Sequence, residues 1–190
     1  MRLDEEYRLS EYVDLGRLDD NEKVHIVRNK VNGVIGVRKY IALDLEEIYL
    51  FLKENPNPYI PKIYECIQTN TNLIVIEEYL SGKNLEEILK EKIFSEKDAA
   101  DIIICLCNAL YPLHNAKMPV ICRDLKAENV ILTNEGEVKL IDFDIARIYQ
   151  PGKSKDTVMM GTQGYAAPEQ FGFGQTDART DIYALGVLLN

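Results

Sequence analysis

The stretch over residues 121–147 constrains the fold most, because it places several polar groups around a short β-hairpin. It reads ICRDLKAENVILTNEGEVKLIDFDIAR. Two apolar, β-branched runs, residues 130–132 and 138–141, flank the turn Asn-Glu-Gly at residues 134–136, and this pattern predicts a hairpin. A hairpin returns the chain to the end where it began, so the flanking polar residues are expected to lie close together. These are Asp124, Lys126, Asn129 and Asp142.

The four polar side chains suit phosphoryl transfer, in which a protein mainly positions groups and stabilises charge on the transferred phosphoryl group. The Asn129 amide and the Asp142 carboxylate offer the oxygen ligands that Mg²⁺ prefers. Asp124 can accept or orient the proton of an attacking hydroxyl. Lys126 can offset negative charge near the transferred group.

Four motifs, in order along the chain, resemble those of the catalytic domain of eukaryotic-type (Hanks-type) Ser/Thr protein kinases, and we expect a bacterial origin. RDLKAEN resembles the catalytic loop, and IDFD resembles the magnesium-binding motif that follows it. GTQGYAAPE resembles the end of the activation segment, and TDIYALGVLL resembles the start of the next helix. Together they predict a kinase domain, since four such motifs rarely occur together in this order.

The resemblance implies an α+β, two-lobed protein-kinase-like fold. Residues 1–79 would form an N-lobe with an antiparallel sheet, and residues 80–190 a helical C-lobe. The family domain continues for several helices beyond the one that begins near Thr180, so we expect a C-lobe truncated within that helix. Its exposed apolar surface could then support self-association.

The N-lobe resemblance assigns the nucleotide contacts. Lys39 would contact the α/β-phosphates of ATP and pair with Glu47 or, as the second choice, Glu46. Glu77 falls at an unusual position for a charge, next to the expected hinge; it could pair with Lys39 or a neighbour, or the register could be off by one. The remaining expected ATP contacts are Gly16, Val24, Val37, Glu78, Leu80 and Ile131.

The expected phosphate-covering loop departs from the family pattern. Only Gly16 remains of the three glycines, and Asp19 and Asp20 stand where phosphates would approach. Glycines allow backbone N–H groups to come close to phosphates, whereas carboxylates oppose it. We therefore expect either weak ATP affinity or a loop that opens outward.

The C-lobe resemblance assigns further roles. Ser154 and Thr157 are candidate phosphorylation sites in the activation loop, with Arg123 as a partner for the phosphate. Thr162 would contact the catalytic loop and, with Lys126, favours Ser/Thr over Tyr hydroxyls. Two further residues, Asp181 and Cys122, would respectively hold the loop backbone and replace the family histidine.

Periodicity predicts several elements without the resemblance. Strands are expected over residues 24–27, 34–37, 59–67 and 73–76. Helices are expected over 41–54, 85–89 and 96–115, the last beginning with a capping pattern at Ser95.

Composition excludes some classes of function. A net charge of −9 argues against nucleic acid or an anionic membrane as a partner. No apolar run approaches the roughly 20 residues that span a bilayer, and residues 1–6 lack the apolar region of a signal peptide. We therefore expect a cytoplasmic protein whose four cysteines are reduced, buried thiols.

The sequence thus predicts an ATP- and Mg²⁺-dependent kinase that phosphorylates Ser/Thr hydroxyls of a protein substrate. Two alternatives stay open. One is a pseudokinase that binds nucleotide or protein without transfer, suggested by the poor glycine loop, Cys122 and Asp144. The other is an inactive truncated fragment. The intact Lys39 and Asp124 favour the enzyme.

Overall fold

A computed structural model describes most of the chain, which divides into two compact units. The described residues are 3–18, 23–152, 156, 160–172 and 174–190. Unit 1 comprises residues 1–57 and 61–80, and unit 2 comprises residues 58–60 and 81–190. The architecture is α+β, as the sequence predicted, with an antiparallel sheet in unit 1 and most of the helical residues in unit 2.

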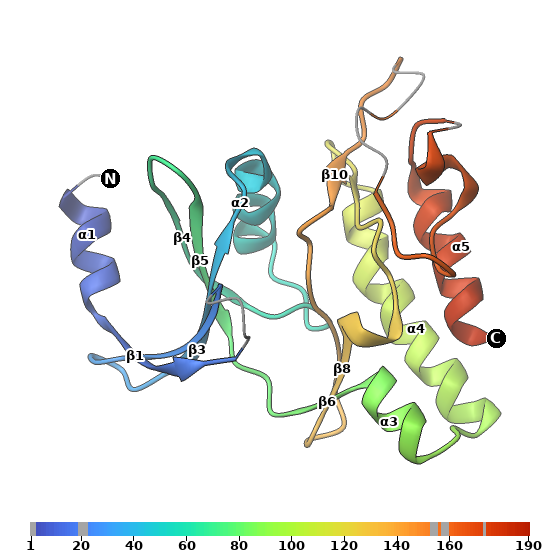
Figure 1. Cartoon of the computed structure of the whole chain (residues 1–190), viewed down its shortest axis with the longest axis horizontal. Coiled ribbons are helices and arrows are strands. Elements are labelled where there is room, and N and C mark those ends of the chain that lie inside the picture. The colour runs from blue at the N-terminus through green and yellow to red at the C-terminus, as the bar shows by residue number, and fades with distance from the viewer. Residues whose placement is uncertain (1–2, 19–22, 153–155, 157–159, 173) are drawn as a thin grey trace. The chain divides into compact units, whose positions relative to one another are not determined.

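Unit 1 is built on a five-stranded antiparallel sheet in the order β1-β2-β3-β5-β4 (Figure 1). The strands are β1 (Tyr12–Arg17), β2 (Val24–Asn29), β3 (Ile35–Ile41), β4 (Ile63–Gln68) and β5 (Leu73–Glu78). The predicted turn between β2 and β3 is confirmed: Gly33 has a φ of +75°, which an L-residue rarely adopts. The Asn29 side chain stabilises this turn by accepting hydrogen bonds from the N–H groups of Val31 and Asn32.

The helices of unit 1 differ from the prediction. These elements are α1 (Leu3–Ser10), the 3₁₀ turn η1 (Leu43–Leu45) and α2 (Glu46–Glu54). The helix expected from Ile41 begins at Glu46 instead, because Ile41 pairs with Leu73 as the last residue of β3. Strand pairing across the sheet therefore overrides the helical spacing of these apolar residues. Helix α1 was not predicted from the sequence.

The strand predicted over residues 59–67 is also shorter than expected, because β4 begins at Ile63. Pro61 precedes it and has no N–H group to donate to a strand ladder. On α2 the buried side chains of Ile48, Tyr49 and Leu52 form the core-facing side, and α2 contacts β4.

In its described residues, unit 2 combines the helices α3, α4 and α5 with short strands and turns (Figure 1). The helices are α3 (Leu85–Glu91), α4 (Glu96–His114) and α5 (Ala178–Leu189). One sheet has the order β6 (Gly82–Asn84), β8 (Val130–Thr133) and β9 (Val138–Leu140); a second pairs β7 (Val120–Ile121) with β10 (Arg147–Ile148). The 3₁₀ turns are η2 (Ala127–Asn129) and η3 (Pro168–Phe171).

Helix α4 carries the core of unit 2. It begins where the sequence predicted, with the Ser95 hydroxyl accepting a 3.1 Å hydrogen bond from the N–H of Asp98. Its buried face is Ile102, Leu106, Ala109, Leu110 and Leu113. The helix contacts α5, β7 and β9, so it supports the elements on both sides of the polar cluster.

The hairpin predicted around residues 134–136 is present as β8 and β9. Val130 pairs with Leu140 and Leu132 pairs with Val138, while Gly136 closes the turn with a φ of +84°. Val130 and Leu140 are fully buried, which anchors the end of the hairpin nearest the polar residues.

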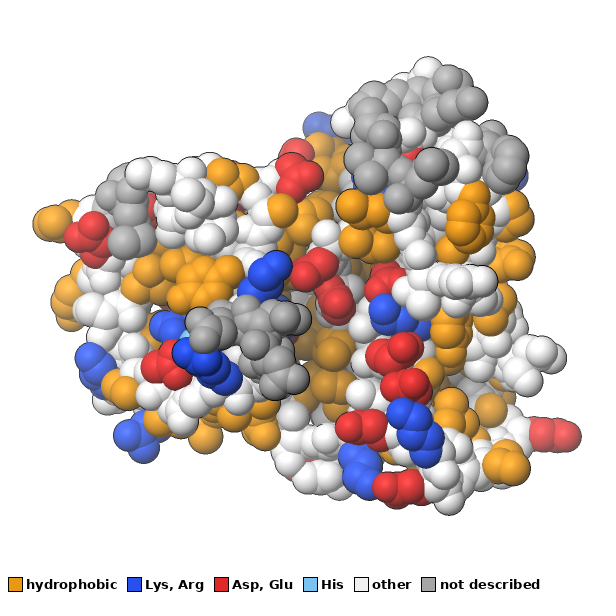
Figure 2. All heavy atoms as spheres, viewed as in Figure 1, with side chains coloured by type: hydrophobic (Ala, Val, Ile, Leu, Met, Phe, Trp, Pro, Cys, Tyr) orange, Lys and Arg blue, Asp and Glu red, His pale blue; other side chains and the backbone are white. Residues whose placement is uncertain are grey.

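The surface of unit 2 over α3 carries interspersed charges of both signs (Figure 2). No helix in the described ranges is both long and apolar enough to cross a bilayer.

All four cysteines are free thiols, but only Cys122 is buried and Cys107 is exposed, so the expectation of four buried thiols is wrong. Burial raises the pKa of Cys66 to about 11, and this thiol is therefore neutral and unreactive at physiological pH.

Candidate active site

Asp124 is the centre of a hydrogen-bonded cluster in the loop before η2. Its Oδ1 accepts a 2.6 Å hydrogen bond from the Thr162 hydroxyl. Its Oδ2 accepts a 3.0 Å hydrogen bond from Asn129 Nδ2 and lies 2.9 Å from Lys126 Nζ. The structure thus brings the predicted proton acceptor together with Lys126, Asn129 and Thr162. Three donors on one carboxylate fix its orientation.

Lys126 is held by the same cluster. Its Nζ donates to the Thr162 hydroxyl at 3.2 Å, in addition to its ion pair with Asp124. Partial burial lowers the pKa of Lys126, but the hydrogen bond and charge of Asp124 outweigh burial, and the net pKa is raised. The ammonium group is therefore charged at neutral pH and can face developing negative charge.

The two predicted metal ligands lie at the hairpin ends. Asn129 is buried; its Nδ2 donates to the carbonyl and carboxylate of Asp124, which leaves the amide oxygen for a cation. Its backbone carbonyl accepts a hydrogen bond from Ile141, the residue before Asp142. Asp142 has a φ of +70°, a costly conformation for a non-glycine residue, and Oδ1 accepts from the N–H of Asp144.

This donor set fits a hard cation that keeps other oxygen ligands. One carboxylate and one amide oxygen are few for a transition metal but suit Mg²⁺, which commonly binds one or two carboxylates plus phosphates and water. Within the described residues there is no group of three or more His, Cys, Asp and Glu that could form a closed metal cage.

A buried aspartate on α5 holds the backbone before Asp124. The Asp181 carboxylate accepts hydrogen bonds from the N–H groups of Cys122 (2.9 Å) and Arg123 (2.8 Å). His114 Nε2 lies 2.7 Å from the same carboxylate, so this histidine is structural. Arg123 has a φ of +70°. The Asp181 contacts stabilise this strained backbone, as the family resemblance implied.

Cys122 has no acid–base role in this arrangement. It is buried, and burial followed by the charge of Asp181 raises the pKa of the thiol well above its usual range. The thiol is neutral and acts as a small apolar group.

In unit 1, the ion pair of Lys39 is formed with Glu77. The Lys39 Nζ lies 2.6 Å from Glu77 Oε1, and both side chains are largely buried. Lys39 is paired with Val75 across the β3–β5 ladder, which places Glu77 diagonally opposite on the same face of the sheet. The sequence had left this pairing open as one alternative. Glu47 is exposed on α2, and its pairing with Lys39 stays a prediction.

The remaining expected nucleotide contacts lie on strands and connections. Val24 pairs with Lys39 and Val37 with Glu77 in neighbouring ladders. Gly16 has a φ of +147° at a bulge in β1, and its N–H donates to Asp14 Oδ1. Half-buried Glu78 ends β5, half-buried Leu80 follows it, and Ile131 lies on β8. Their contacts with ATP stay predictions, and Asp19 and Asp20 lie outside the described residues.

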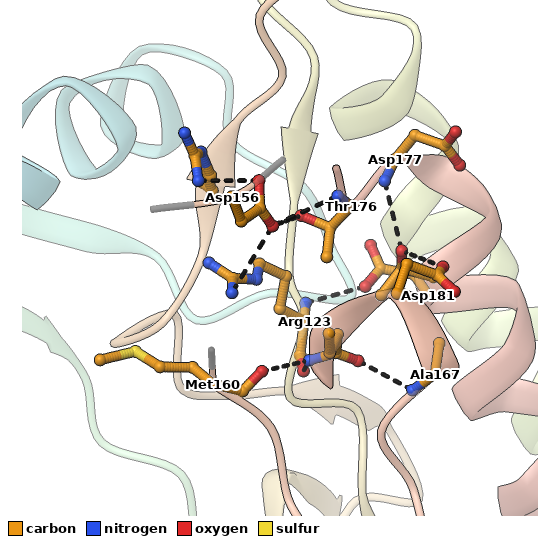
Figure 3. Close-up of polar contacts among 11 residues, drawn as sticks. Arg123, Asp156, Met160, Ala167, Thr176, Asp177 and Asp181 are labelled. Atoms are coloured by element: carbon orange, nitrogen blue, oxygen red, sulfur yellow. Dashed lines mark hydrogen bonds and ion pairs between the residues drawn. The ribbon is translucent and has the colours of Figure 1, made fainter. Parts of the chain in front are cut away.

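Two residues that contact this loop, Gln170 and Asp156, were not predicted from the sequence, because only the tertiary fold brings them to it. Gln170 is buried; its Nε2 donates to the carbonyls of Arg123 (2.8 Å) and Met160 (2.7 Å), and its Oε1 accepts from Ala167 (Figure 3). Asp156 pairs with Arg147 and Arg123. The candidate phosphorylation sites Ser154 and Thr157 lie outside the described residues.

Comparison with known proteins identifies relatives of the chain. A family model described as the protein kinase domain matches residues 23–190. The probable serine/threonine-protein kinase PknB of Corynebacterium glutamicum is 40% identical over 119 residues, which cover 60% of this chain and 18% of that protein. The probable serine/threonine-protein kinase PBL8 of Arabidopsis thaliana is 33% identical over 186 residues, covering 92% of this chain and 44% of that protein.

A mammalian kinase is also similar to this chain over part of its length. The serine/threonine-protein kinase PAK 1 of Mus musculus is 33% identical over 139 residues, covering 73% of this chain and 25% of that protein. The chain therefore spans less than half the length of these curated relatives.

Proposed function

The chain belongs to the protein kinase domain family, and from this membership we propose that it transfers the γ-phosphoryl group of ATP, with Mg²⁺, to serine or threonine hydroxyls of a protein substrate. The observation that carries the proposal is the Asp124 carboxylate, which Thr162, Asn129 and Lys126 hold in one orientation. The names of the three relatives, all serine/threonine-protein kinases, support the choice of substrate class.

In this proposal Asp124 orients the substrate hydroxyl and accepts its proton as the new P–O bond forms and the bond between the γ-phosphorus and the β-phosphate oxygen breaks, releasing ADP. Lys126 remains charged because its pKa is raised, so it can stabilise the negative charge on the transferred phosphoryl group. Thr162 links the two residues, since its hydroxyl donates to Asp124 and accepts from Lys126. The protein thus supplies position and charge rather than a covalent intermediate.

Asn129 and Asp142 are the residues that would hold Mg²⁺ through their side-chain oxygens. When bound, the ion supplies positive charge that neutralises the ATP phosphates. Asn129 Nδ2 also donates a hydrogen bond to Asp124, and this bond orients the proposed proton acceptor in the metal-free protein.

Lys39 would contact the α/β-phosphates, with its charge partly balanced by Glu77. The adenosine part would be held by Val24, Val37, Leu80 and Ile131 and by backbone groups at Glu78. Gly16 would begin the cover over the phosphates. Glu47 would reach Lys39 in the nucleotide-bound protein.

The test is intact mass after incubation with Mg-ATP, comparing the wild type with Asp124→Asn and with the exposed control Asp101→Asn. Asp124→Asn keeps the size of the side chain but cannot accept a proton, so the rate should fall by roughly 10²- to 10⁴-fold. The control should match the wild type. Wild-type transfer by Asp124→Asn would refute the assignment of the proton acceptor.

Nucleotide binding should persist in Asp124→Asn. At about 100 times its dissociation constant, a nucleotide stabilises the folded protein by about 2.7 kcal/mol, which a thermal melt resolves. A magnesium-dependent shift without any phosphate on the wild type would instead indicate a nucleotide-binding protein that does not catalyse transfer.

A further inference from the structure

Asp156 is a buried carboxylate that joins three separate parts of unit 2 (Figure 3). Its Oδ1 accepts a 2.7 Å hydrogen bond from Arg147 Nη1, and its Oδ2 lies 3.7 Å from Arg123 Nη2. The same Oδ2 accepts hydrogen bonds from the hydroxyl (2.6 Å) and the N–H (3.2 Å) of Thr176. Only 4% of the Asp156 side chain is exposed.

The charge of Asp156 offsets two neighbouring guanidinium groups. The Arg123 side chain is 5% exposed, and Arg147 is also largely buried. Burial lowers the pKa of Arg123, the Asp156 carboxylate opposes that effect, and the nearby Arg147 cation adds to it. Without Asp156, two buried like charges would lie together, an arrangement that burial in low dielectric strongly disfavours.

The cluster is coupled to the catalytic loop through Arg123, the residue directly before Asp124. The N–H of Arg123 donates to Asp181 on α5, and its carbonyl accepts from Gln170 of η3. Its φ of +70° must be maintained by contacts of this kind. Asp156 pairs with the side chain of Arg123. Contacts therefore fix both the backbone and the side chain of this residue.

An exposed ion pair at the start of α5 provides a contrast. Arg179 and Asp177 also form a 2.7 Å pair, but the Arg179 side chain is 89% exposed and the pair spans two residues of one helix end. Such a pair adds little beyond helix capping. Asp156 instead links β10, the catalytic loop and the segment before α5. Its removal should therefore alter the position of Asp124.

We propose that Asp156 is a positioning residue for phosphoryl transfer: its carboxylate holds Arg123 and Arg147 so that the catalytic loop keeps its geometry without a phosphate group on the activation segment. This inference rests on the proposed function. The sequence predicted that Arg123 pairs with a phosphate on Ser154 or Thr157. In the structure, Arg123 already pairs with a carboxylate of the chain, Asp156.

The test compares Asp156→Asn, Asp156→Glu and Asp156→Ala with the control Asp101→Asn, each treated with phosphatase before the assay. Initial rates give kcat and the KM for ATP separately. We expect the phosphatase-treated wild type to retain its kcat, and Asp156→Asn to lose roughly 10- to 100-fold in kcat with little change in KM. Asp156→Glu should recover part of the loss.

Formate separates positioning from general destabilisation. In Asp156→Ala the site has room for a small carboxylate, so added sodium formate should restore part of kcat, whereas it should not help Asp156→Asn. An unchanged kcat in Asp156→Asn, or a loss of thermal stability with full kcat for the folded fraction, would overturn the proposal. So would a wild type that needs phosphorylation for transfer.

A separate measurement distinguishes failure of this inference from failure of the proposed function. If the wild type transfers no phosphoryl group, the proposed function fails, and amide hydrogen exchange then decides the role of Asp156. We expect the Arg123 amide to exchange about tenfold faster in Asp156→Asn than in Asp101→Asn, since its opening free energy reflects the lost contacts. Equal exchange would refute the positioning role.

Discussion

Among the described residues, each unit contains a lysine–carboxylate pair in which both side chains are largely buried, and these two pairs differ in their other hydrogen-bond partners. Lys39–Glu77 in unit 1 is 2.6 Å long, with side chains 15% and 9% exposed. Lys126–Asp124 in unit 2 is 2.9 Å long, with side chains 20% and 15% exposed. The distances and burial are similar, so neither explains a difference in function.

The difference lies in the surrounding donors. The Asp124 carboxylate also accepts hydrogen bonds from Thr162 and Asn129, so its charge is shared among donors and its direction is fixed. Glu77 instead lies diagonally opposite Lys39 on adjacent strands, where it places a negative charge beside the proposed phosphate ligand. The Lys126–Asp124 pair is suited to hold a reacting group, and the Lys39–Glu77 pair is suited to adjust the affinity for an anion.

The largest test of this comparison replaces each lysine with methionine, which keeps the unbranched side chain but removes the charge. We expect Lys126→Met to lower kcat by roughly 10²- to 10³-fold with ATP affinity preserved. Lys39→Met should instead weaken ATP binding by roughly 10- to 100-fold, the value of one charge-assisted hydrogen bond. Steady-state kinetics and nucleotide titration measure both. The comparison fails if both variants mainly lower kcat, or if both mainly weaken ATP binding.

A smaller effect is expected from Glu77→Gln. The amide keeps the size of the side chain but removes the charge, so Lys39 loses its pair in the free protein and gains attraction for phosphate. We expect the free protein to lose about 1 to 3 kcal/mol of stability and ATP to bind several-fold more tightly. Thermal melts and isothermal titration measure the two effects. Weaker ATP binding would mean that Glu77 orients Lys39 rather than competing for it.

The smallest effect belongs to an exposed pair, Lys83–Glu91, whose side chains are 54% and 64% exposed. Its hydrogen bond lowers the pKa of Glu91 and raises that of Lys83. Any stabilisation by Glu91 is therefore present above the ordinary glutamate pKa and is lost as pH falls through the lowered value in the folded protein.

We expect Glu91→Gln to leave the melting curve unchanged at neutral pH, because solvent and salt screen an exposed pair. A carboxyl-carbon NMR titration of Glu91 in the wild type should show the lowered pKa, and adding salt should reduce the shift. A measurable loss of stability in Glu91→Gln would show that burial is not what separates this pair from the other two.

Local pattern predicted much of unit 2. The hairpin with Gly136 and the start of α4 at Ser95 came directly from turn chemistry and apolar spacing, because both depend on residues close together in the chain. The same approach failed at α2. Apolar spacing from Ile41 suggested a helix, but pairing with Leu73 drew Ile41 into β3.

The sequence by itself determined the family and the residues proposed for catalysis, because Asp124, Lys126, Asn129 and Asp142 lie within one short, ordered stretch around a hairpin. Only the tertiary structure decided which charges meet. Strand register set Glu77 beside Lys39, and the path of the segment before α5 set Asp156 beside Arg123. Ion pairs between residues far apart in the chain depend on how strands and loops pack, and neither periodicity nor motif spacing encodes that packing.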